Sequence, residues 1–360
     1  RTGLGGRLAE SLVGLFGASY GRVILGLVLV GVVLAFLMPS TLGRIVLLVP
    51  VVASFADRLG FAYGSRGRNG MILAMGLGTF MPSTAILPAN LANMVLLGTS
   101  ETIYGIHMTY VGYLVLHFPV LGALKAAAIV VLTTWLFREE PGAVSVSEAP
   151  PPLSRDEKVL AVILALALAF WATDFIHHIS PAWIALAAAL VCITPRVGVL
   201  PPKVLTDDVN YGAWLFVAGI IGMGALVSHT GLGVTIGELL LANVPLTADG
   251  GLIAFYQIFV IGGAINLVAT APIVPPIMTA FADAIAQATN WPLRSVLLAE
   301  VPSFMVFPLP RQAPPVAIVM AIGGVPMRAG VRVLAVYFVI AVIVILPLQY
   351  LWGRLLGVYP

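Results

Sequence analysis

The sequence predicts an all-α integral membrane protein. Its 360 residues are 60% hydrophobic and only 9% charged, whereas soluble domains carry about 25% charged residues. Apolar stretches typical of membrane helices recur along the chain, for example at residues 160–172, 184–193, 213–227 and 331–346. No separate soluble domain is therefore expected. The lone cysteine, Cys192, excludes a disulfide framework and cysteine-based metal sites.

Three pairs of similar segments indicate an internal duplication. Residues 1–12 resemble residues 229–240, the segment ending at Asp57 resembles the one ending at Asp283, and residues 80–98 correspond loosely to residues 304–323. Because the three matches occur in the same order at nearly constant separation, we predict two structural repeats. The second copy follows an apolar helix at 211–228, but nothing precedes Arg1, so we expect that N-terminal helices of the first repeat are missing. The alternative is a genuinely shorter protein.

Hydrophobic length and Gly/Pro breaks divide the first repeat, residues 1–137, into its elements. Residues 4–17 predict an amphipathic helix at the membrane surface. Two apolar arms, 21–38 and 43–59, flank Pro39-Ser40-Thr41 and predict a re-entrant hairpin. Helices at 69–82 and from 94 onward flank a Pro/Asn-rich interruption and predict a broken helix, and residues 109–137 predict a full span.

The second repeat, residues 159–360, follows a polar linker at 138–158 that is expected to lie in solvent. Its predicted elements are spans at 159–174 and 181–194, the helix at 211–228 and a second surface helix within 229–250. They continue with a second pair of arms around Asn266, a second broken helix around 308–316 and a last span at 331–352.

The distribution of Lys and Arg predicts the orientation. With each pair of arms taken as a re-entrant hairpin, most basic loop residues fall on one face: Arg58, Arg66, Arg68, Arg138, Arg155, Lys158, Arg196, Lys203, Arg328 and Arg332. The opposite face carries only Arg294 and Arg354. The positive-inside rule then places the linker in the cytoplasm and the C-terminus outside. The first hairpin opens inward and the second outward, so the two halves run in opposite senses.

The four interruptions predict a binding site. A helix that stops inside a membrane leaves backbone groups that lipid cannot satisfy, so such breaks occur where protein or a water-filled cavity covers them. The hairpin tips at Ser40-Thr41 and Asn266 would face the breaks at Asn90–Asn93 and Ala313–Pro315. Their carbonyls and hydroxyls suit a small cation, and the half-helix N-termini suit an anion.

Two arginines add positive charge beside these breaks. Arg44 lies one turn into the second arm of the first hairpin, and Arg311 lies beside the second break. An intramembrane arginine costs at least about 2.5 kcal/mol on insertion scales unless it is paired, and a role in holding an anionic substrate explains both residues. For Arg44 the alternatives are snorkelling or pairing with an acid such as Glu300.

Other site types find less support in the residues. His177-His178 lack acidic or cysteine partners for a metal site, and the net charge of +3 is explained by loop charge, so no nucleic-acid role is expected. An intramembrane enzyme would need a second acid to pair with Glu300. A channel would need a continuous polar lining, whereas here polarity is concentrated at the breaks.

The order of these motifs resembles the divalent anion:sodium symporter family of the ion transporter superfamily. The resemblance rests on a TGLG segment, a surface helix, a hairpin with a Ser/Thr tip and an LP…N broken helix, followed by the same series ending in LPRQAPPVAIVMAIGG. It covers nearly all of this chain, but only about three quarters of such a transporter.

The resemblance implies an elevator-type carrier for dicarboxylates, sulfate or related anions, often coupled to Na⁺ and usually dimeric. Carried over by position, the family's Ser-Asn-Thr signature falls at Ser40-Thr41, without the asparagine, and at Asn266–Thr270, where the triplet reads Asn-Leu-Val. The Thr-Pro-Pro-Asn break becomes Ala313-Pro314-Pro315-Val316, while the first copy keeps Asn93. These departures remove side-chain oxygens expected around two sodium ions, so proton coupling or exchange stays open.

We therefore expect an inverted-repeat secondary transporter with two re-entrant hairpins and two broken helices, not an enzyme. Its partners would be a small anion, the lipid bilayer of a bacterial inner membrane and, with the scaffold helices present, a second copy. No cofactor is expected beyond Na⁺ as a candidate coupling ion. A further alternative is a chain that is inactive without its missing helices.

The expected substrate-binding residues are Ser40, Thr41, Arg44, Asn90, Asn93, Asn266, Thr270, Arg311 and Pro314. The expected ion-binding residues are Ser40, Thr41, Asn93, Asn266 and Ala313.

Overall fold

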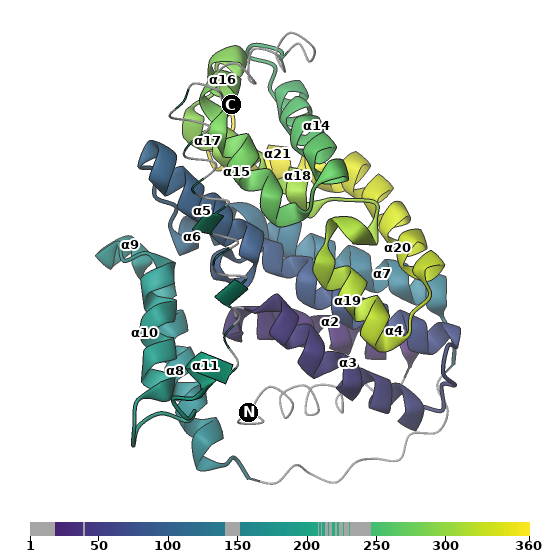
Figure 1. Cartoon of the computed structure of the whole chain (residues 1–360). Coiled ribbons are helices and arrows are strands. Elements are labelled where there is room, and N and C mark those ends of the chain that lie inside the picture. Colours follow the sequence, from purple (N-terminus) through teal and green to yellow (C-terminus); the bar gives the residue numbers. More distant parts are fainter. Residues whose placement is uncertain are drawn as a thin grey trace.

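The computed structural model describes residues 19–38, 40–140, 152–207 and 246–360, with isolated residues between 208 and 245. Every regular element in these ranges is a helix (Figure 1), which confirms the predicted all-α class. The predicted surface helices at 4–17 and within 229–250 and most of the helix at 211–228 lie outside the described residues, as does the middle of the linker.

The first hairpin consists of α2 (Tyr20–Leu37) and α3 (Thr41–Arg58). Ser40 ends the connection because its side-chain oxygen accepts a hydrogen bond of 3.1 Å from the Gly43 N–H, which caps the first turn of α3. The two helices lie close to the predicted arms of 21–38 and 43–59.

The first broken helix runs from α4 (Arg66–Phe80) through two short 3₁₀ turns, η1 (Pro82–Ala85) and η2 (Leu87–Ala89), to α5 (Leu91–Tyr104). Pro82 and Pro88 each lie at the start of a turn, where their missing N–H groups are tolerated. Asn90 caps α5, because its side-chain oxygen accepts from the Ala92 N–H at 3.0 Å.

A long helix follows each broken helix. In the first half, α6 (Tyr110–His117), the π-helical segment η3 (Phe118–Leu124) and α7 (Lys125–Phe137) form one helix of 28 residues. In the second half, α20 (Met327–Ile340), the π-helical segment η6 (Ala341–Ile345) and α21 (Leu346–Leu355) form one of 29 residues. Both agree with the predicted spans at 109–137 and 331–352.

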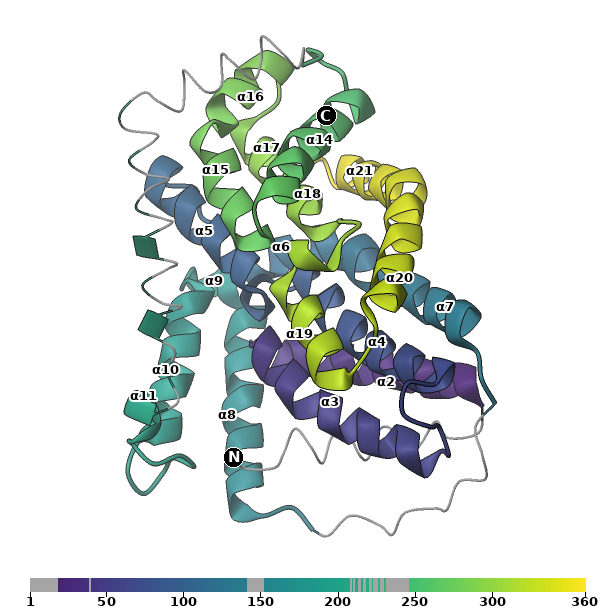
Figure 2. The same ribbon diagram turned by 45° about the vertical axis from the view of Figure 1, so that its right-hand side comes forward.

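Helices α8 (Arg155–Ala172), α9 (Asp174–His177), α10 (Pro181–Ile193) and α11 (Val204–Asp207) follow the linker. In both views α8 and α10 lie side by side at the edge of the molecule (Figures 1 and 2). Helix α8 begins inside the predicted linker of 138–158, because Ser154 and Glu157 form a reciprocal capping box there.

The second hairpin has a shorter and more divided second arm. Helix α14 (Leu252–Val268) is followed by η4 (Ala271–Ile273), α15 (Val274–Ala280) and α16 (Ala282–Thr289). The predicted interruption around Ile265–Leu267 thus lies a few residues later, because α14 continues to Val268.

The second broken helix consists of α17 (Leu293–Ala299), α18 (Val301–Met305), η5 (Pro310–Gln312) and α19 (Pro314–Gly323). Its first half is divided at Glu300, because Pro302 has no N–H to donate and clashes with the carbonyl four residues earlier. That carbonyl, of Leu298, accepts a hydrogen bond of 3.3 Å from the Tyr359 hydroxyl instead. Both halves therefore contain a hairpin, a broken helix and a long helix in that order; their opposite membrane senses stay a prediction.

Glycines allow close helix crossings around α4. An added Cβ at Gly78 would lie 2.9 Å from the Val28 Cα of α2, and one at Gly76 would lie 2.4 Å from Val319 of α19. Figures 1 and 2 show α19 lying against α3 and α4. These crossings place the second half's break beside the first half's hairpin and broken helix.

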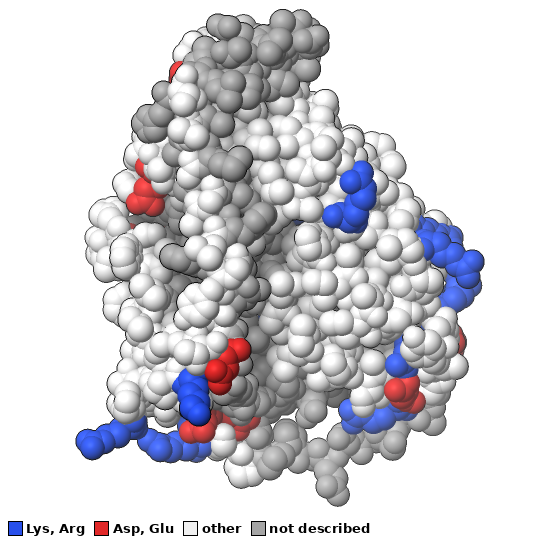
Figure 3. Space-filling view, viewed as in Figure 1, with Lys and Arg blue, Asp and Glu red and all other residues white. Residues whose placement is uncertain are grey.

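The outer surface suits a bilayer. In the described part of the chain, three helices are long and apolar enough to cross a membrane, Tyr20–Leu37, Tyr110–Phe137 and Met327–Leu355. Large apolar side chains such as Trp135, Trp183 and Ile343 are exposed on α7, α10 and η6. The face in Figure 3 carries most of its charged side chains along its lower and lateral edges, with a broad uncharged area between them.

Candidate functional site

A cavity of about 330 Å³ lies where all four helix interruptions meet. Its volume is at the lower end of the range of about 300–1,000 Å³ typical of small-molecule sites. It is lined by the first hairpin tip, the first break, the second hairpin tip and the second break, through Ser40, Thr41, Leu42, Phe80, Pro88, Asn90, Leu91, Met94, Ala271, Pro272, Ala313, Pro314 and Pro315.

Helix N-termini surround this cavity. Helices α3, α5 and α19 begin at Thr41, Leu91 and Pro314, and the first turn of each contributes to the lining, together with the start of η4 at Ala271. The first N–H groups of a helix have no acceptor within the helix, and the aligned peptide dipoles give this end a partial positive charge. The partly positive ends of these helices therefore face the cavity, but α19 offers no free N–H there, because Pro314 and Pro315 have none and the Val316 N–H donates to the Ala313 carbonyl at 2.9 Å.

Asn90 adds a side-chain donor to this site. Its carbonyl oxygen is used to cap α5, but its buried amide nitrogen Nδ2 has no hydrogen-bond partner within the described structure. Asn90 lines the cavity, and a buried unpaired donor is costly unless a ligand or water completes it. Asn90 is thus placed to donate to an anion in the cavity.

Ser40 and Thr41 bring the first hairpin tip into the same site. Ser40 is exposed at the tip, and its hydroxyl oxygen accepts from the Gly43 N–H. The Thr41 hydroxyl donates to the Ala89 carbonyl at 3.1 Å and so joins the tip to the end of the first break. Both of these predicted residues line the cavity.

Arg44 lies beneath the tip and does not line the cavity. Its guanidinium is fully buried and donates to the carbonyls of Met38, Thr79 and Ala89 and to the Thr41 hydroxyl. Glu300 is not its partner: in the described chain this carboxylate accepts from the Thr279 hydroxyl at 3.3 Å. Among the described residues no acid pairs with Arg44, so no carboxylate of that part of the chain balances its positive charge next to the cavity.

Asn93 and Asn266 turn into the protein rather than into the cavity. The Asn93 amide donates to the Thr84 and Ile86 carbonyls, at 3.0 and 3.1 Å, and closes the first break. The Asn266 amide donates to the Ser303 carbonyl at 3.3 Å, while its backbone carbonyl accepts from the Gln312 amide at 3.2 Å. The side-chain oxygen of each asparagine has no partner among the described residues.

Of the remaining predicted residues, two line the cavity and two do not. Ala313 and Pro314 line the cavity at the second break. Thr270 lies one residue before the lining residue Ala271, and Arg311 is exposed in η5; neither belongs to the lining.

The lining is more apolar than the residue types at the breaks indicate. Phe80 and Met94 contribute to it and were not predicted, and neither were Pro88, Ala271 and Pro272, whereas Ala313 and Pro314 were. The physical reason is that the polar side chains of Arg44, Asn93 and Asn266 are used to satisfy carbonyls left open by the breaks. The remaining polarity comes from Ser40, Thr41, Asn90 and the helix N-termini.

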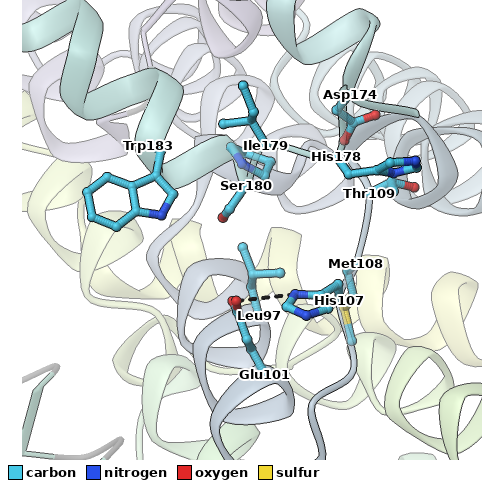
Figure 4. A pocket seen from close by; sticks show the side chains of 11 residues that line it. Leu97, Glu101, His107, Met108, Thr109, Asp174, His178, Ile179, Ser180 and Trp183 are labelled. Carbon is cyan, nitrogen blue, oxygen red and sulfur yellow. Dashed lines mark ion pairs between the residues drawn. The ribbon is translucent and has the colours of Figure 1, made fainter. Parts of the chain in front are cut away.

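A second cavity, of about 540 Å³, lies between the end of α5 and the α9–α10 turn (Figure 4). It contains Glu101, His107, Asp174 and His178, but Glu101 pairs with His107 at 3.2 Å and Asp174 accepts from the Tyr110 N–H. The described residues contain no group of three or more His, Cys, Asp and Glu side chains arranged for a metal ion. The convergence of helix ends therefore makes the first cavity the stronger candidate for the site of function.

Comparison with known proteins gives a match over almost the whole chain. The family described as the sodium:sulfate symporter transmembrane region matches residues 1–359. A relative from Cupriavidus necator described as a membrane protein is 24% identical over 263 residues, 71% of this chain and 51% of the relative. An uncharacterized transporter from Haemophilus influenzae is 26% identical over 246 residues, 64% of this chain and 50% of that protein. The chain thus spans about half the length of these curated relatives.

Proposed function

Because the chain belongs to the sodium:sulfate symporter family, we propose that it forms part of a secondary active transporter that carries small anions, such as sulfate or a dicarboxylate, through the cavity at the four helix interruptions. Membership in this family confirms the resemblance drawn from the sequence motifs. It also identifies the chain as a transporter component rather than an enzyme, as expected.

The main support for an anionic substrate is that several helix N-termini lie around one cavity. An anion there would accept hydrogen bonds from first-turn N–H groups such as those of Thr41 and Leu91, and from the free amide of Asn90. The charge of Arg44, which has no acidic partner in the part of the chain that the structure describes, lies just beneath the tip and favours the same sign of ligand. A cation in the cavity would meet the wrong ends of these helices.

The proposed mechanism is alternating access. The two hairpins and the two broken helices would move together as one body past a scaffold and expose the cavity first on one side of the membrane and then on the other. No covalent step is involved. The breaks would travel with the anion, so that its hydrogen-bond partners stay unchanged during the crossing.

The orientation, assembly and coupling of the transporter belong to the same proposal. The linker is proposed to be cytoplasmic, the C-terminus to lie outside and the protein to be a dimer in a bacterial inner membrane. Na⁺ and H⁺ are the candidate coupling ions, and exchange of one anion for another is the alternative.

Uptake into proteoliposomes tests the proposal. The full-length protein is reconstituted and supplied with radiolabelled sulfate or succinate under an imposed Na⁺ gradient, an imposed pH gradient or an internal load of unlabelled anion. We expect saturable uptake of at least one of these anions, and the condition that drives it identifies the coupling.

An Asn90→Asp variant tests the placement of the anion. The aspartate keeps the side-chain oxygen that caps α5 but replaces the free donor by a negative charge, so its melting temperature should stay near that of the wild type while the apparent affinity for the anion falls at least about tenfold, that is, by about 1.4 kcal/mol. Uptake with unchanged affinity in this variant would contradict the placement of the anion in this cavity.

A further inference from the structure

Lys125 is fully buried in the middle of the long helix of the first half. It is the first residue of α7 and directly follows the π-helical segment η3. Such π-bulges change the direction of the side chains that follow them and are frequent at functional sites. A buried lysine in a membrane helix is costly, so its presence there indicates a function.

The Lys125 ammonium lies between the two broken helices. Its Nζ atom is 3.4 Å from the Thr84 hydroxyl oxygen in the first break and 3.4 Å from the Met305 carbonyl at the end of α18 in the second. The Thr84 hydroxyl donates its own hydrogen to the Met81 carbonyl at 2.6 Å, so its lone pairs are available to the ammonium. Met305 lies in the last turn of its helix, where the backbone carbonyls carry partial negative charge.

No carboxylate pairs with Lys125 in the described part of the chain. Buried ionisable side chains on neighbouring elements include His117 and Tyr113 on α6 and Glu300 between α17 and α18, and each has a hydrogen-bond partner other than Lys125. His117 Nδ1 lies 3.3 Å from the Gln349 amide, the Tyr113 hydroxyl donates to the Thr84 carbonyl at 3.1 Å, and Glu300 accepts from Thr279. The acceptors that the described structure gives the Lys125 Nζ atom are thus a hydroxyl and a carbonyl oxygen.

Those acceptors are the kind that hold a small metal cation at a helix break. Hydroxyl and carbonyl oxygens from two interrupted helices would attract Na⁺ if the space between them were empty. Here the ammonium already occupies that space, and it is attached to the same chain. The first break is also joined to the cavity, because the Thr84 carbonyl accepts from Asn93 on α5, the helix whose cap Asn90 lines the cavity.

We propose that Lys125 is a built-in cation that joins the two helix breaks in place of a bound Na⁺, so that anion binding needs no metal ion at this junction. The inference rests on the proposed anion transport and narrows its coupling.

Thermal unfolding of two variants tests this inference independently of transport. Lys125→Ala leaves a space the size of the ammonium and its stem, whereas Lys125→Met fills the same volume without charge. The melting temperature of each purified full-length variant is measured in choline, sodium and ammonium chloride at equal ionic strength, and anion uptake is measured in the same salts.

The proposal predicts that the wild type melts at the same temperature in choline and sodium chloride. Lys125→Ala should melt at a lower temperature in choline chloride and regain stability saturably with Na⁺ or NH₄⁺, as a ligand that binds only the folded state requires. Lys125→Met should show no such recovery. Uptake by Lys125→Ala should be lost in choline chloride and partly restored by the cation that restores its stability.

Two results would overturn the assignment. One is a saturable Na⁺-dependent rise in the melting temperature of the wild type that Lys125→Ala shares. The other is a loss of stability in Lys125→Ala that neither cation restores, since the lysine would then act only in packing. Absence of anion uptake by the wild type would count against the proposed transport function instead and would leave the unfolding measurements interpretable.

Discussion

Arg44 holds the tip of the first hairpin against the first broken helix. Its guanidinium donates to four acceptors, the carbonyls of Met38, Thr79 and Ala89 and the Thr41 hydroxyl. Thr41 lines the cavity, as do Phe80 and Asn90, the neighbours of Thr79 and Ala89. One buried side chain therefore sets the positions of several lining residues and contributes a positive charge beneath them.

Two substitutions of Arg44 distinguish the contribution of its positive charge from that of the hydrogen bonds made by its planar guanidinium. Arg44→Gln should lower the melting temperature and abolish uptake, because each buried carbonyl left without a donor costs about 1–3 kcal/mol. Arg44→Lys keeps the charge but offers a compact ammonium instead of a planar fork, so it should recover only part of both properties. Thermal unfolding and uptake of the two variants give the comparison, and full activity in Arg44→Gln would refute this role.

The sequence predicts that Arg44 needs a partner but not which one. Hydropathy identifies a charge between two apolar arms, whereas the acceptors Thr79 and Ala89 are 35 and 45 residues away and are reached only in the folded chain. Lys125 was not identified from the sequence at all, because the apolar stretch 109–137 is long enough to span a membrane with one lysine in it. The direction of its side chain depends on the π-helical segment before it, which leaves no clear mark in the hydropathy.

The helices of the two halves meet along α4 and α19. Gly76 and Gly323 allow this close approach, since an added Cβ would lie 2.4 Å from Val319 and 2.5 Å from Ile72, respectively. The crossing brings Pro314 and Pro315, at the start of α19, to the cavity that the first hairpin and the first break also line. Helix packing through small residues thus determines how closely the two breaks approach each other.

A pair of glycine substitutions tests this contact between elements. Gly76→Ala should lower the melting temperature and weaken anion uptake, because α19 must move away from α4 to accommodate the methyl group. Gly263→Ala on α14 is the matched control: no atom lies within 4 Å of its added Cβ, and alanine should favour the helix by up to about 1 kcal/mol. Equal melting temperatures for the two variants would show that the α4–α19 crossing does not depend on Gly76.

Element positions are predicted well from the sequence where apolar runs are bounded by proline or asparagine. The first hairpin and the long helices begin and end close to their predicted residues. The divisions at Phe281 and Glu300 and the two π-helical segments were not predicted, because they interrupt helices without interrupting the apolar pattern. The extension of α14 to Val268 has the same cause, since Asn266 is polar but buried and fits within a helix.

At the scale of the whole molecule, the two halves form one cavity that neither half forms alone. Ser40 and Asn90 come from the first half, and Ala271 and Pro314 from the second. The internal duplication predicted that four interruptions would be present. Their convergence depends on packing between helices that are distant in the sequence, which a repeat pattern does not specify. The mechanism proposed above, in which the hairpins and broken helices of both halves move as one body, requires such a shared site.

Protection of cavity residues by the transported anion tests this central claim most directly. Single cysteines are introduced in a Cys192→Ala background. Ser40→Cys reports on the first hairpin and Pro314→Cys on the second break. Glu140→Cys is the control, because the native Glu140 side chain is 74% exposed. The account predicts that a saturating concentration of the anion slows modification by a water-soluble thiol reagent at positions 40 and 314 alike and leaves position 140 unchanged. Protection at only one of the two cavity positions, or at neither, would contradict a single anion site built from both halves.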